Sequence, residues 1–393
     1  MRLALLAVVP LALAGGLTAC GGDDDDEQKP GSAGPPPPAN VAQGFPALRV
    51  RTVIGGLDHP WDVKPIGRGR LLVTERDRAR LSLVNNGKRH TIDFPRRKVW
   101  VSGETGLLGM AVDPDFADNH RVYLCQGGFP ADGGHDVHVT AWRLRVGERK
   151  VTKIKTLVGH FPTSSGRHGG CRLLIANNGA LLVGTGDAAT GTNPEDKTSL
   201  GGKTLMLDRI SGDPWPDNPF VNAANKNRRY VHTYGHRNVQ GLAQRADGTL
   251  WSAEHGPDRD DEVNLLKNGG DYGWNPVPGY NESVPMTDQG LPGKQVAAAW
   301  SSGAPTVATS GASFVAGKEW GWYTGTLAVA ALKASEVLFM KFDSAGKLVK
   351  VRIPAALTSY GRLRAVTALP NGSLLVTTDN GGDDAVLRVR PVS

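Results

Sequence analysis

The sequence predicts an all-β protein, a six-bladed β-propeller, on three observations. The 393 residues include 51 Gly and 26 Pro, which imply too many turns for a chain built mainly of long helices. Short β-rich segments recur six times, each starting at a turn residue and ending at a polar stop. Their spacing of roughly 45 to 80 residues fits one four-stranded sheet with variable loops, and few stretches have the helical period that an α/β protein needs.

An export signal is expected at residues 1–20. Arg2 is followed by an apolar run that is too short and too interrupted by glycine to span a membrane comfortably. The run ends in Leu17–Cys20, which resembles the lipobox of a bacterial lipoprotein and makes Cys20 the lipidated residue. The alternative is an ordinary signal peptide that is cut near Ala19. The acidic and proline-rich residues 21–44 predict a solvated tether.

These features predict an exported lipoprotein that faces the cell envelope or the exterior and contacts the membrane only through its N-terminal lipid. If Cys20 carries the lipid, Cys125 and Cys171 remain in an oxidising compartment. The sequence leaves open whether these two cysteines form a disulfide or stay as buried thiols, since it does not show whether they meet.

The propeller is expected to span residues 45–393. Its six β-rich segments are 69–75, 119–125 (the least regular), 179–187, 248–254, 325–331 and 372–379. We expect a strand near Leu48 to Ile54 to close the ring by joining the last blade.

The net charge is +7, and because residues 1–44 are acidic on balance, the propeller itself is more basic than the whole chain. This excess of positive charge is compatible with an anionic partner, but it does not identify that partner. Nucleic acid is not expected, since export removes that partner and no interleaving of aromatic and basic residues is visible.

Propellers place functional residues where strands and loops meet the central channel, so the polar segments there are informative. Several motifs occur in a defined order: Gly103–Gly109, Asp113–Phe116, His168–Gly170, Gly235–Gly241, Glu254–Pro257, Asp261–Asn264, Gly273–Trp274 and Arg362–Arg364. In this order they resemble the soluble glucose/sorbosone dehydrogenase family, from Leu48 to the C-terminus. The resemblance implies six blades and a Ca²⁺-dependent quinoprotein that uses pyrroloquinoline quinone (PQQ) to oxidise aldose sugars to lactones.

The resemblance also implies three catalytic residues. Oxidation of an anomeric hydroxyl needs a base for its proton, and a neutral imidazole suits this task near pH 7. His168 matches the base, Asp187 matches the carboxylate that orients it, and Arg237 matches the residue that polarises the cofactor carbonyl. Without the resemblance, His168 would be read as a surface or capping residue and Asp187 as a turn residue.

A set of basic and polar residues matches the contacts to PQQ, which carries three carboxylates. If Arg362 and Arg364 lie on a strand, both face the same side, and two guanidinium groups there repel unless an anion lies between them. Taken alone, the pair would be read as two solvated arginines. The matched residues are Glu104, Arg237, Asn238, Gln240, His255, Thr306, Lys333, Arg362 and Arg364.

Two calcium sites are implied by the same match. The backbone carbonyls of Gly256 and Pro257 match ligands of the ion that also binds the quinone, and hard oxygen ligands are what Ca²⁺ prefers. Glu262 and the carbonyl of Tyr272 resemble a second, structural site. No EF-hand spacing or zinc-binding cluster is visible in the sequence.

Two positions depart from glucose-oxidising members of the family, which have Gln at both. Glu104 would meet either the substrate hydroxyls or the carboxylates of the cofactor, and it would repel the latter unless it is protonated or paired with Ca²⁺. His255 is what we expect in the branch that oxidises many aldoses. The chain also looks short for long insertions that narrow the choice of substrate, so we expect a broad aldose preference.

Two other functions stay open at this point. One is a catalytically silent propeller that binds carbohydrate or protein at the cell surface. The other is a Ca²⁺-dependent lactonase, since six-bladed propellers also carry that chemistry. The basic set favours a polyanionic cofactor and therefore the dehydrogenase, whose partners would be an aldose and an unidentified electron acceptor.

Overall fold

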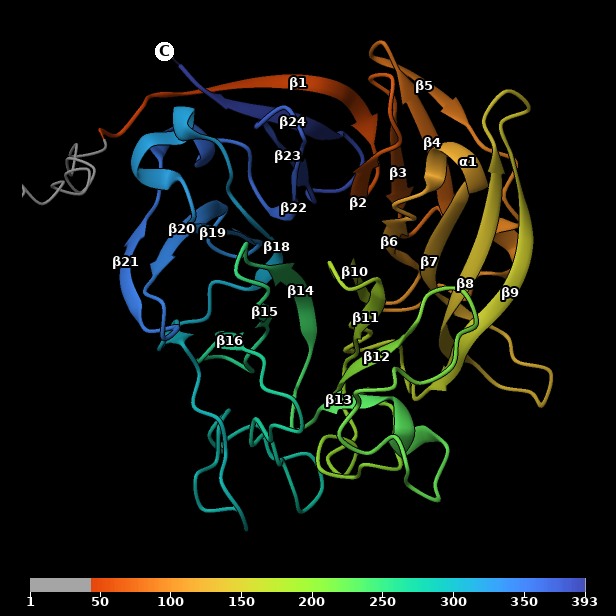
Figure 1. Cartoon of the computed structure of the whole chain (residues 1–393), viewed down its shortest axis with the longest axis vertical. Helices are drawn as coiled ribbons and strands as arrows, with labels where there is room; N and C mark the ends of the chain where they lie inside the picture. The colour runs from red at the N-terminus through yellow and green to blue at the C-terminus, as the bar shows by residue number, and fades with distance from the viewer. Residues whose placement is uncertain (1–43, 393) are drawn as a thin grey trace, which may run out of the picture. The chain divides into compact units, whose positions relative to one another are not determined.

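The computed structural model describes residues 44–392, which form a ring of six four-stranded antiparallel sheets (Figure 1). The predicted six-bladed propeller is therefore confirmed. Within these residues, helical structure is limited to α1 (Phe116–Asn119) and the 3₁₀ segments η1 (Arg96–Lys98), η2 (Asn227–Tyr230), η3 (Lys318–Tyr323) and η4 (Ala355–Leu357). None of the helices in this part of the chain is long and apolar enough to cross a membrane. Cys20 and the predicted signal and tether, apart from residue 44, lie outside the described residues.

Each blade is built from the innermost strand outward. The first contains β2 (Pro60–Pro65), β3 (Leu71–Glu75), β4 (Arg80–Asn85) and β5 (Lys88–Thr91). The second contains β6 (Leu107–Val112), β7 (Arg121–Gly128), β8 (Asp136–Arg145) and β9 (Lys150–Phe161). The third contains β10 (Arg172–Ile175), β11 (Ala180–Gly184), β12 (Thr204–Asp208) and β13 (Val231–Thr233).

The remaining blades repeat this order. The fourth contains β14 (Val239–Gln244), β15 (Leu250–Glu254), β16 (Glu262–Leu265) and β17 (Trp300–Ser301). The fifth contains β18 (Thr309–Phe314), β19 (Leu327–Ala331), β20 (Glu336–Phe342) and β21 (Leu348–Arg352). The sixth contains β22 (Leu363–Ala368), β23 (Leu374–Thr378), β24 (Asp384–Pro391) and, as its outermost strand, β1 (Leu48–Leu57).

The six segments found in the sequence are the second strands of the six blades. Every residue of β3, β11, β19 and β23 is buried, because each blade packs between two neighbours and so has two covered faces. A strand that is buried on both faces is mostly apolar, and the polar residues of β3 and β23 come only at their ends. The short apolar runs were therefore the strongest signal of the blades.

The ring closes through the two ends of the described chain. β1 pairs antiparallel with β24, with Leu48 opposite Pro391 and Arg51 opposite Arg388, as the closing strand was predicted to do. A disulfide between Cys125 in β7 and Cys171, just before β10, links the second and third blades, and their Cα atoms are 5.6 Å apart. The pairing settles the alternative that the sequence left open.

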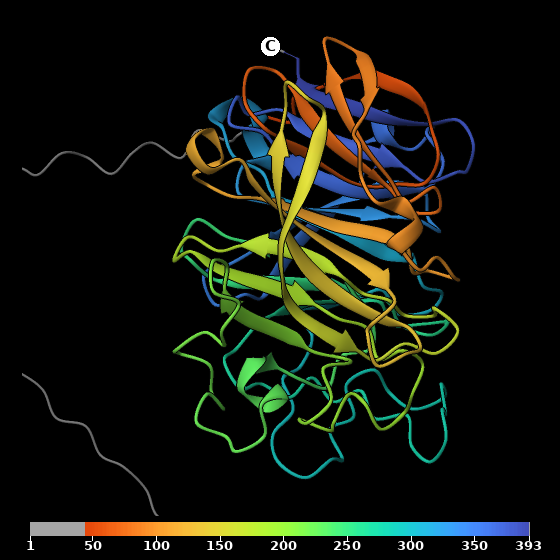
Figure 2. The same cartoon turned by 90° about the vertical axis from the view of Figure 1, so that its right-hand side faces the viewer.

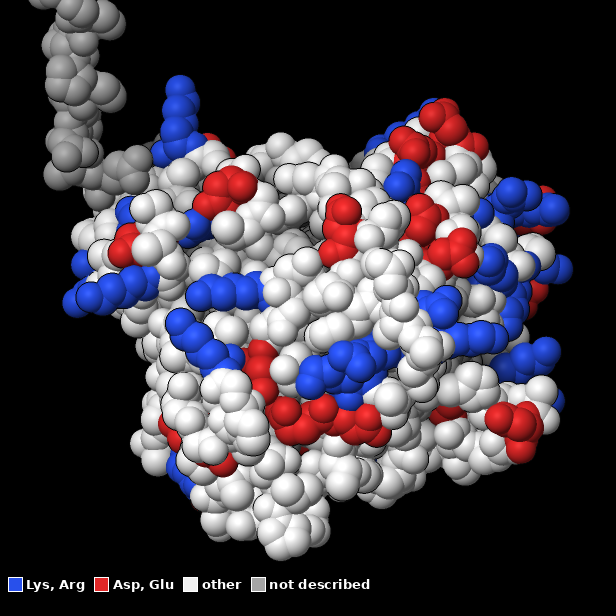
Figure 3. All heavy atoms as spheres, turned by 60° about the horizontal axis from the view of Figure 1, so that its bottom comes forward, with Lys and Arg blue, Asp and Glu red and all other residues white. Residues whose placement is uncertain are grey.

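The innermost strands β2, β6, β10, β14, β18 and β22 contact one another in a closed circle. Because every blade is wound in the same order, these strands run in the same direction. We call the end of the channel where they begin the start face and the opposite end the far face. Figures 1 and 2 show the long loops of the third and fourth blades extending beyond the ring. Figure 3 shows basic and acidic side chains interspersed on the side that these loops form.

Candidate active site

The start face brings together the predicted catalytic residues, which come from different blades. His168 precedes β10, Asp187 follows β11 and Arg237 precedes β14. All three side chains are buried, with exposed fractions of 3%, 0% and 4% respectively. Ionisable side chains that converge in a buried position are candidates for chemistry rather than for solubility.

His168 and Asp187 form a hydrogen-bonded pair in which Nδ1 of the imidazole lies 2.7 Å from Oδ1 of the carboxylate. A carboxylate can only accept, so Nδ1 carries a hydrogen, and in the neutral imidazole the free lone pair is then on Nε2. Asp187 also accepts hydrogen bonds from Trp274 Nε1 at 2.8 Å and from the Tyr280 hydroxyl at 2.7 Å. The carboxylate is therefore fixed from several sides and holds the imidazole in one orientation.

Tyr280 reinforces this pair. Its hydroxyl is 3.0 Å from His168 Nδ1 as well as in contact with Asp187. Burial and the charge of Asp187 raise the pKa of Tyr280, so its hydroxyl stays protonated and acts as a donor. Nothing in the sequence pointed to Tyr280, which comes from the long loop between β16 and β17 and belongs to no motif.

A close approach of two backbones places His168 beside Asp187. A Cβ atom added at Gly186 would overlap the carbonyl oxygen of His168, so only glycine fits there. Gly186→Ala is expected to push the His168 segment away, destabilise the fold by about 1–3 kcal/mol and lower kcat/KM at least about tenfold. Urea unfolding and steady-state kinetics would measure both effects. Gly55→Ala is the matched control, because a Cβ atom at Gly55 meets no atom within 4 Å; equal behaviour of the two variants would contradict the prediction.

Arg237 is held from two sides. Its guanidinium donates to Glu282 Oε1 at 2.7 Å and to the carbonyl oxygen of His255 at 3.0 Å. Its Nε atom is buried and has no hydrogen-bond partner among the described residues. Arg167 donates to the same oxygen of Glu282 at 2.7 Å. Burial alone would raise the pKa of Glu282, but the hydrogen bonds from Arg237 and Arg167 hold it below its usual value. Glu282 was not predicted from the sequence.

Four of the predicted cofactor contacts form one hydrogen-bonded chain. Asn238 Nδ2 donates to Glu104 Oε2 at 3.0 Å, and Gln240 Nε2 donates to Asn238 Oδ1 at 3.2 Å. Arg364 donates to Gln240 Oε1 at 3.1 Å. Burial alone would raise the pKa of Glu104, but the nearby imidazoles of His168 and His255, followed by the Asn238 amide and Arg364, hold it below its usual value. Glu104 is therefore an ionised carboxylate that is paired within the protein.

The two arginines of the Arg362–Arg364 motif lie in different environments. Arg364 is buried and its Nε donates to Asp379 at 2.8 Å, whereas Arg362 precedes β22 and is exposed. The register of β22 with β23 shifts between Leu363 and Ala365, so the alternation of a regular strand does not apply to this pair. A joint contact of both arginines with one anion stays a prediction.

The other predicted contacts lie on neighbouring loops. Lys333 is exposed and its Nζ is 3.3 Å from the hydroxyl of the buried Thr306. His255 Nε2 is buried and has no hydrogen-bond partner among the described residues. Burial and the charges of Arg364 and Arg237 lower the pKa of His255 to about 3, although Glu104 opposes this shift. His255 is therefore neutral at pH 7.

The low pKa of His255 predicts a pH dependence of stability. The unfolded chain binds a proton near pH 6.5 and the folded protein only near pH 3, so His255 destabilises the fold progressively as the pH falls through this window. In the cofactor-free protein, the unfolding free energy of the wild type should fall between pH 6.5 and 4.5 more steeply than that of His255→Gln. The difference between the two slopes should be at most about 1.4 kcal/mol per pH unit. Urea unfolding at several pH values measures this. The exposed His160→Gln is the control, and identical pH slopes for wild type and His255→Gln would count against it.

The loop that carries Gly256 and Pro257 is fixed by the buried Asp261. Asp261 Oδ1 accepts from the Gly256 amide at 2.9 Å, and Oδ2 accepts from the amides of Val307 and Ala308 at 2.7 and 2.6 Å. Neither carbonyl oxygen, of Gly256 or Pro257, accepts a hydrogen bond from any other described residue. Two free carbonyl oxygens on a fixed loop suit a hard cation.

Glu262 and Tyr272, the predicted residues of the second calcium site, are both buried. Burial and the charge of Glu254 raise the pKa of Glu262 to about 8. Its oxygens accept hydrogen bonds from Thr287 at 2.9 Å and Asn264 at 3.2 Å. Tyr272 is fixed by the hydrogen bond of its hydroxyl to a backbone carbonyl. Their joint role as metal ligands stays a prediction.

Comparison with known proteins finds relatives that match most of this chain. The glucose/sorbosone dehydrogenase family model matches residues 57–388. The chain is 31% identical over 346 residues to the aldose sugar dehydrogenase of Escherichia coli K12, covering 85% of this chain and 91% of that protein. It is 28% identical over 315 residues to quinoprotein glucose dehydrogenase B of Acinetobacter calcoaceticus, covering 72% and 63%. The PQQ-bound structure of the aldose sugar dehydrogenase of Streptomyces coelicolor matches with a TM-score of 0.74 and 28% identity, over 88% of this chain and 99% of that one.

Proposed function

The chain belongs to the glucose/sorbosone dehydrogenase family, and on this basis we propose that it is a PQQ-dependent aldose sugar dehydrogenase that oxidises the anomeric carbon of aldoses to lactones. The observation that carries the proposal is the buried His168–Asp187 pair, which lies on the same face of the channel as Arg237. A fixed base that takes the hydroxyl proton, together with a fixed cation, is what hydride removal from the anomeric carbon of a sugar requires.

The residues of the start face fit a multiply carboxylated cofactor. Buried nitrogen atoms of Arg237 and His255 have no partner among residues 44–392, and such groups are costly unless a ligand satisfies them. Lys333, on the loop after β19, and Arg364, which lies in β22 and is paired with Asp379, add basic groups to this face. When bound, PQQ supplies the carbon that accepts the hydride. We propose that Arg237, together with Asn238, Gln240, His255, Thr306, Lys333, Arg362 and Arg364, would hold it.

His168 would take the proton of the anomeric hydroxyl at Nε2, the nitrogen that the hydrogen bond to Asp187 leaves free. Asp187 would stabilise the imidazolium that forms, while Trp274 and Tyr280 keep the carboxylate in place. The fixed positive charge of Arg237 would stabilise negative charge that develops as the hydride is transferred.

We propose that Ca²⁺ binds at the carbonyl oxygens of Gly256 and Pro257 and adds positive charge to this site. The support is the two carbonyl oxygens without a donor and the loop that Asp261 fixes. A second, structural Ca²⁺ at Glu262 and the Tyr272 carbonyl belongs to the same proposal.

We propose a broad aldose preference. Glu104 and His255 stand where glucose-oxidising members have Gln. Both side chains are fixed in a defined charge state, Glu104 ionised and paired with Asn238, and His255 neutral.

The test is an assay of the purified protein with PQQ, CaCl₂, an artificial dye as electron acceptor and a panel of aldoses. We expect sugar-dependent dye reduction that chelation removes. Two outcomes would overturn the proposal: tight quinone binding without turnover of any sugar indicates a silent propeller, and lactone hydrolysis without quinone indicates a lactonase.

We further propose that the protein is exported and anchored by a lipid on Cys20, which lies outside the described residues. The Cys125–Cys171 disulfide supports the export, because such bonds persist in oxidising compartments. Metabolic labelling with a fatty acid should mark the wild type and not Cys20→Ala, and the variant should leave the membrane fraction. Membrane retention of an unlabelled Cys20→Ala protein would argue against lipid anchoring.

A further inference from the structure

A cavity lies at the far face of the channel, away from the proposed cofactor site. Its volume is about 550 Å³. Its lining comes from the ends of all six innermost strands, whereas His168 and Arg237 precede such strands. Its position sets this cavity apart from the site of sugar oxidation.

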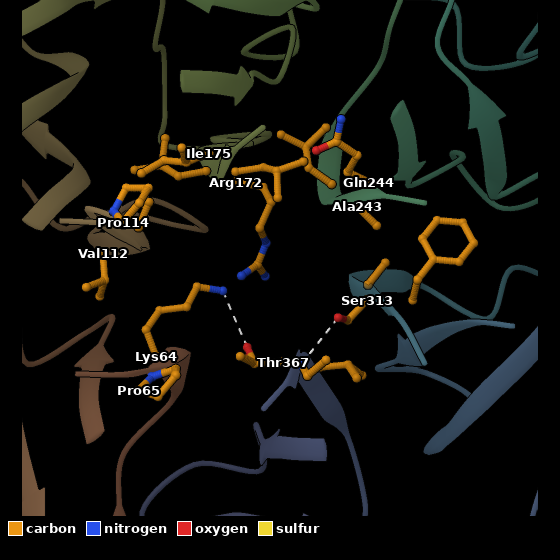
Figure 4. A pocket seen from close by; sticks show the side chains of 18 of the residues that line it. Lys64, Pro65, Val112, Pro114, Arg172, Ile175, Ala243, Gln244, Ser313 and Thr367 are labelled. Atoms are coloured by element: carbon orange, nitrogen blue, oxygen red, sulfur yellow. Dashed lines mark hydrogen bonds between the residues drawn. The ribbon is translucent and has the colours of Figure 1, made fainter. Parts of the chain in front are cut away.

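Two cationic side chains form the floor of this far-face cavity, Lys64 from β2 and Arg172 from β10. Figure 4 shows both side chains pointing into the cavity. Asp62 is the one acidic residue paired with them, with Lys64 Nζ 3.1 Å from its Oδ1 and Arg172 Nη1 3.1 Å from its Oδ2. Two positive charges therefore share one negative charge.

Asp62 has little capacity left to neutralise a second cation. Its Oδ1 also accepts from the Val63 amide at 2.9 Å, and its Oδ2 from the Met110 amide at 3.0 Å. Each oxygen is thus already occupied by a backbone donor and a cation.

Arg172 is 3% exposed, and its Nη2 atom has no hydrogen-bond partner among the described residues. The other acceptor of Lys64 is the Thr367 hydroxyl at 3.4 Å, which is neutral. Burial lowers the pKa of Lys64; Asp62 opposes this shift and the charge of Arg172 adds to it. A buried guanidinium with an unsatisfied donor beside an excess positive charge calls for an anionic acceptor.

The walls of the cavity are different in character from its floor. Val112, Ile175, Ala243 and Phe314 supply apolar surface from four blades. The acidic Asp113 also lines the cavity, but it is paired with the Tyr123 hydroxyl, the Asn119 amide and Arg209. A charged floor below apolar walls matches a molecule with an anionic end and an apolar body.

We propose that the far-face cavity binds a small organic carboxylate, with its carboxylate group at Lys64 and Arg172 and its apolar body against the walls. Arg172 Nη2 and Lys64 Nζ would each donate to the carboxylate, because Nη1 of Arg172 is already paired with Asp62 and Nε donates to the Gln240 carbonyl oxygen at 2.7 Å. An inorganic anion would pair with Lys64 and Arg172 but would make no apolar contacts with the walls.

Calorimetric titration of the full-length protein tests this with benzoate and with benzamide, its neutral isostere. We expect benzoate to bind at least about tenfold more tightly than benzamide, because only benzoate pairs with the cations. Lys64→Met should weaken benzoate binding at least about tenfold, whereas Lys88→Met, which removes an exposed lysine of β5, should leave it unchanged.

Lys64→Gln provides a second variant should Lys64→Met fail to fold, which its thermal unfolding would reveal. A crystal structure with benzoate should place the ligand at Lys64 and Arg172. Equal affinity for benzoate and benzamide, unchanged benzoate affinity in a folded Lys64 variant, or benzoate bound elsewhere would each overturn the proposal. Since the readout is binding without cofactor or sugar, its failure is separate from failure of the proposed dehydrogenase activity.

Discussion

His168→Ala is expected to lower kcat for sugar oxidation by about 10²–10⁴-fold while the protein stays folded and still binds PQQ. The loss follows because His168, oriented by the buried Asp187, supplies the imidazole lone pair that takes the hydroxyl proton. Asp187→Asn should also lower kcat with little change in KM, because an amide no longer enforces a hydrogen on His168 Nδ1. Steady-state kinetics with saturating PQQ and Ca²⁺ measures both.

A second His–Asp pair in the same protein provides the control. His138 Nδ1 lies 2.9 Å from Asp136 Oδ1 in β8, in the outer part of the second blade. His138→Ala should leave kcat close to that of the wild type. Retention of more than about a tenth of the wild-type kcat in His168→Ala would remove this residue from the role of base.

Removing the disulfide is expected to cost about 4 kcal/mol of unfolding free energy. Cys125 and Cys171 are separated by 46 residues, and closing a loop of that length restricts the unfolded chain strongly. The Cys125→Ala/Cys171→Ala double variant should therefore unfold at much lower urea concentration than the oxidised wild type. Because both cysteines are fully buried, the smaller side chains add a modest packing loss.

Reduction separates the two contributions. Wild type treated with dithiothreitol should approach the stability of the double variant, whereas the double variant should not respond to the reductant. A loss below about 1 kcal/mol in the double variant would mean that the bond adds little to the junction between the second and third blades.

The fold could be predicted from the sequence because one strand per blade carries a clear signal. The second strands, such as β11 and β19, are apolar throughout and flanked by turn residues. The outermost strands cannot be predicted from such an apolar run. β5 and β21 are largely exposed or only partly buried, and β17 has two residues, so propensity and period give little information there.

The candidate site could be predicted only in part. Motifs near the innermost strands marked His168, Asp187 and Arg237, and the structure brings all three to the start face. Tyr280 and Glu282 were missed, because a long loop without regular structure carries them into the site and no local pattern encodes its path. The pairing of distant cysteines was undetermined for the same reason, since sequence spacing does not give spatial distance.

The pairing of β1 with β24 has a consequence for biosynthesis. The sixth blade needs the earliest strand of the propeller and the latest one, so the ring can close only after the ribosome has released nearly the whole chain. Until then, the innermost strand at each open end of the incomplete ring lacks one neighbour. The apolar residues at these ends remain available to chaperones.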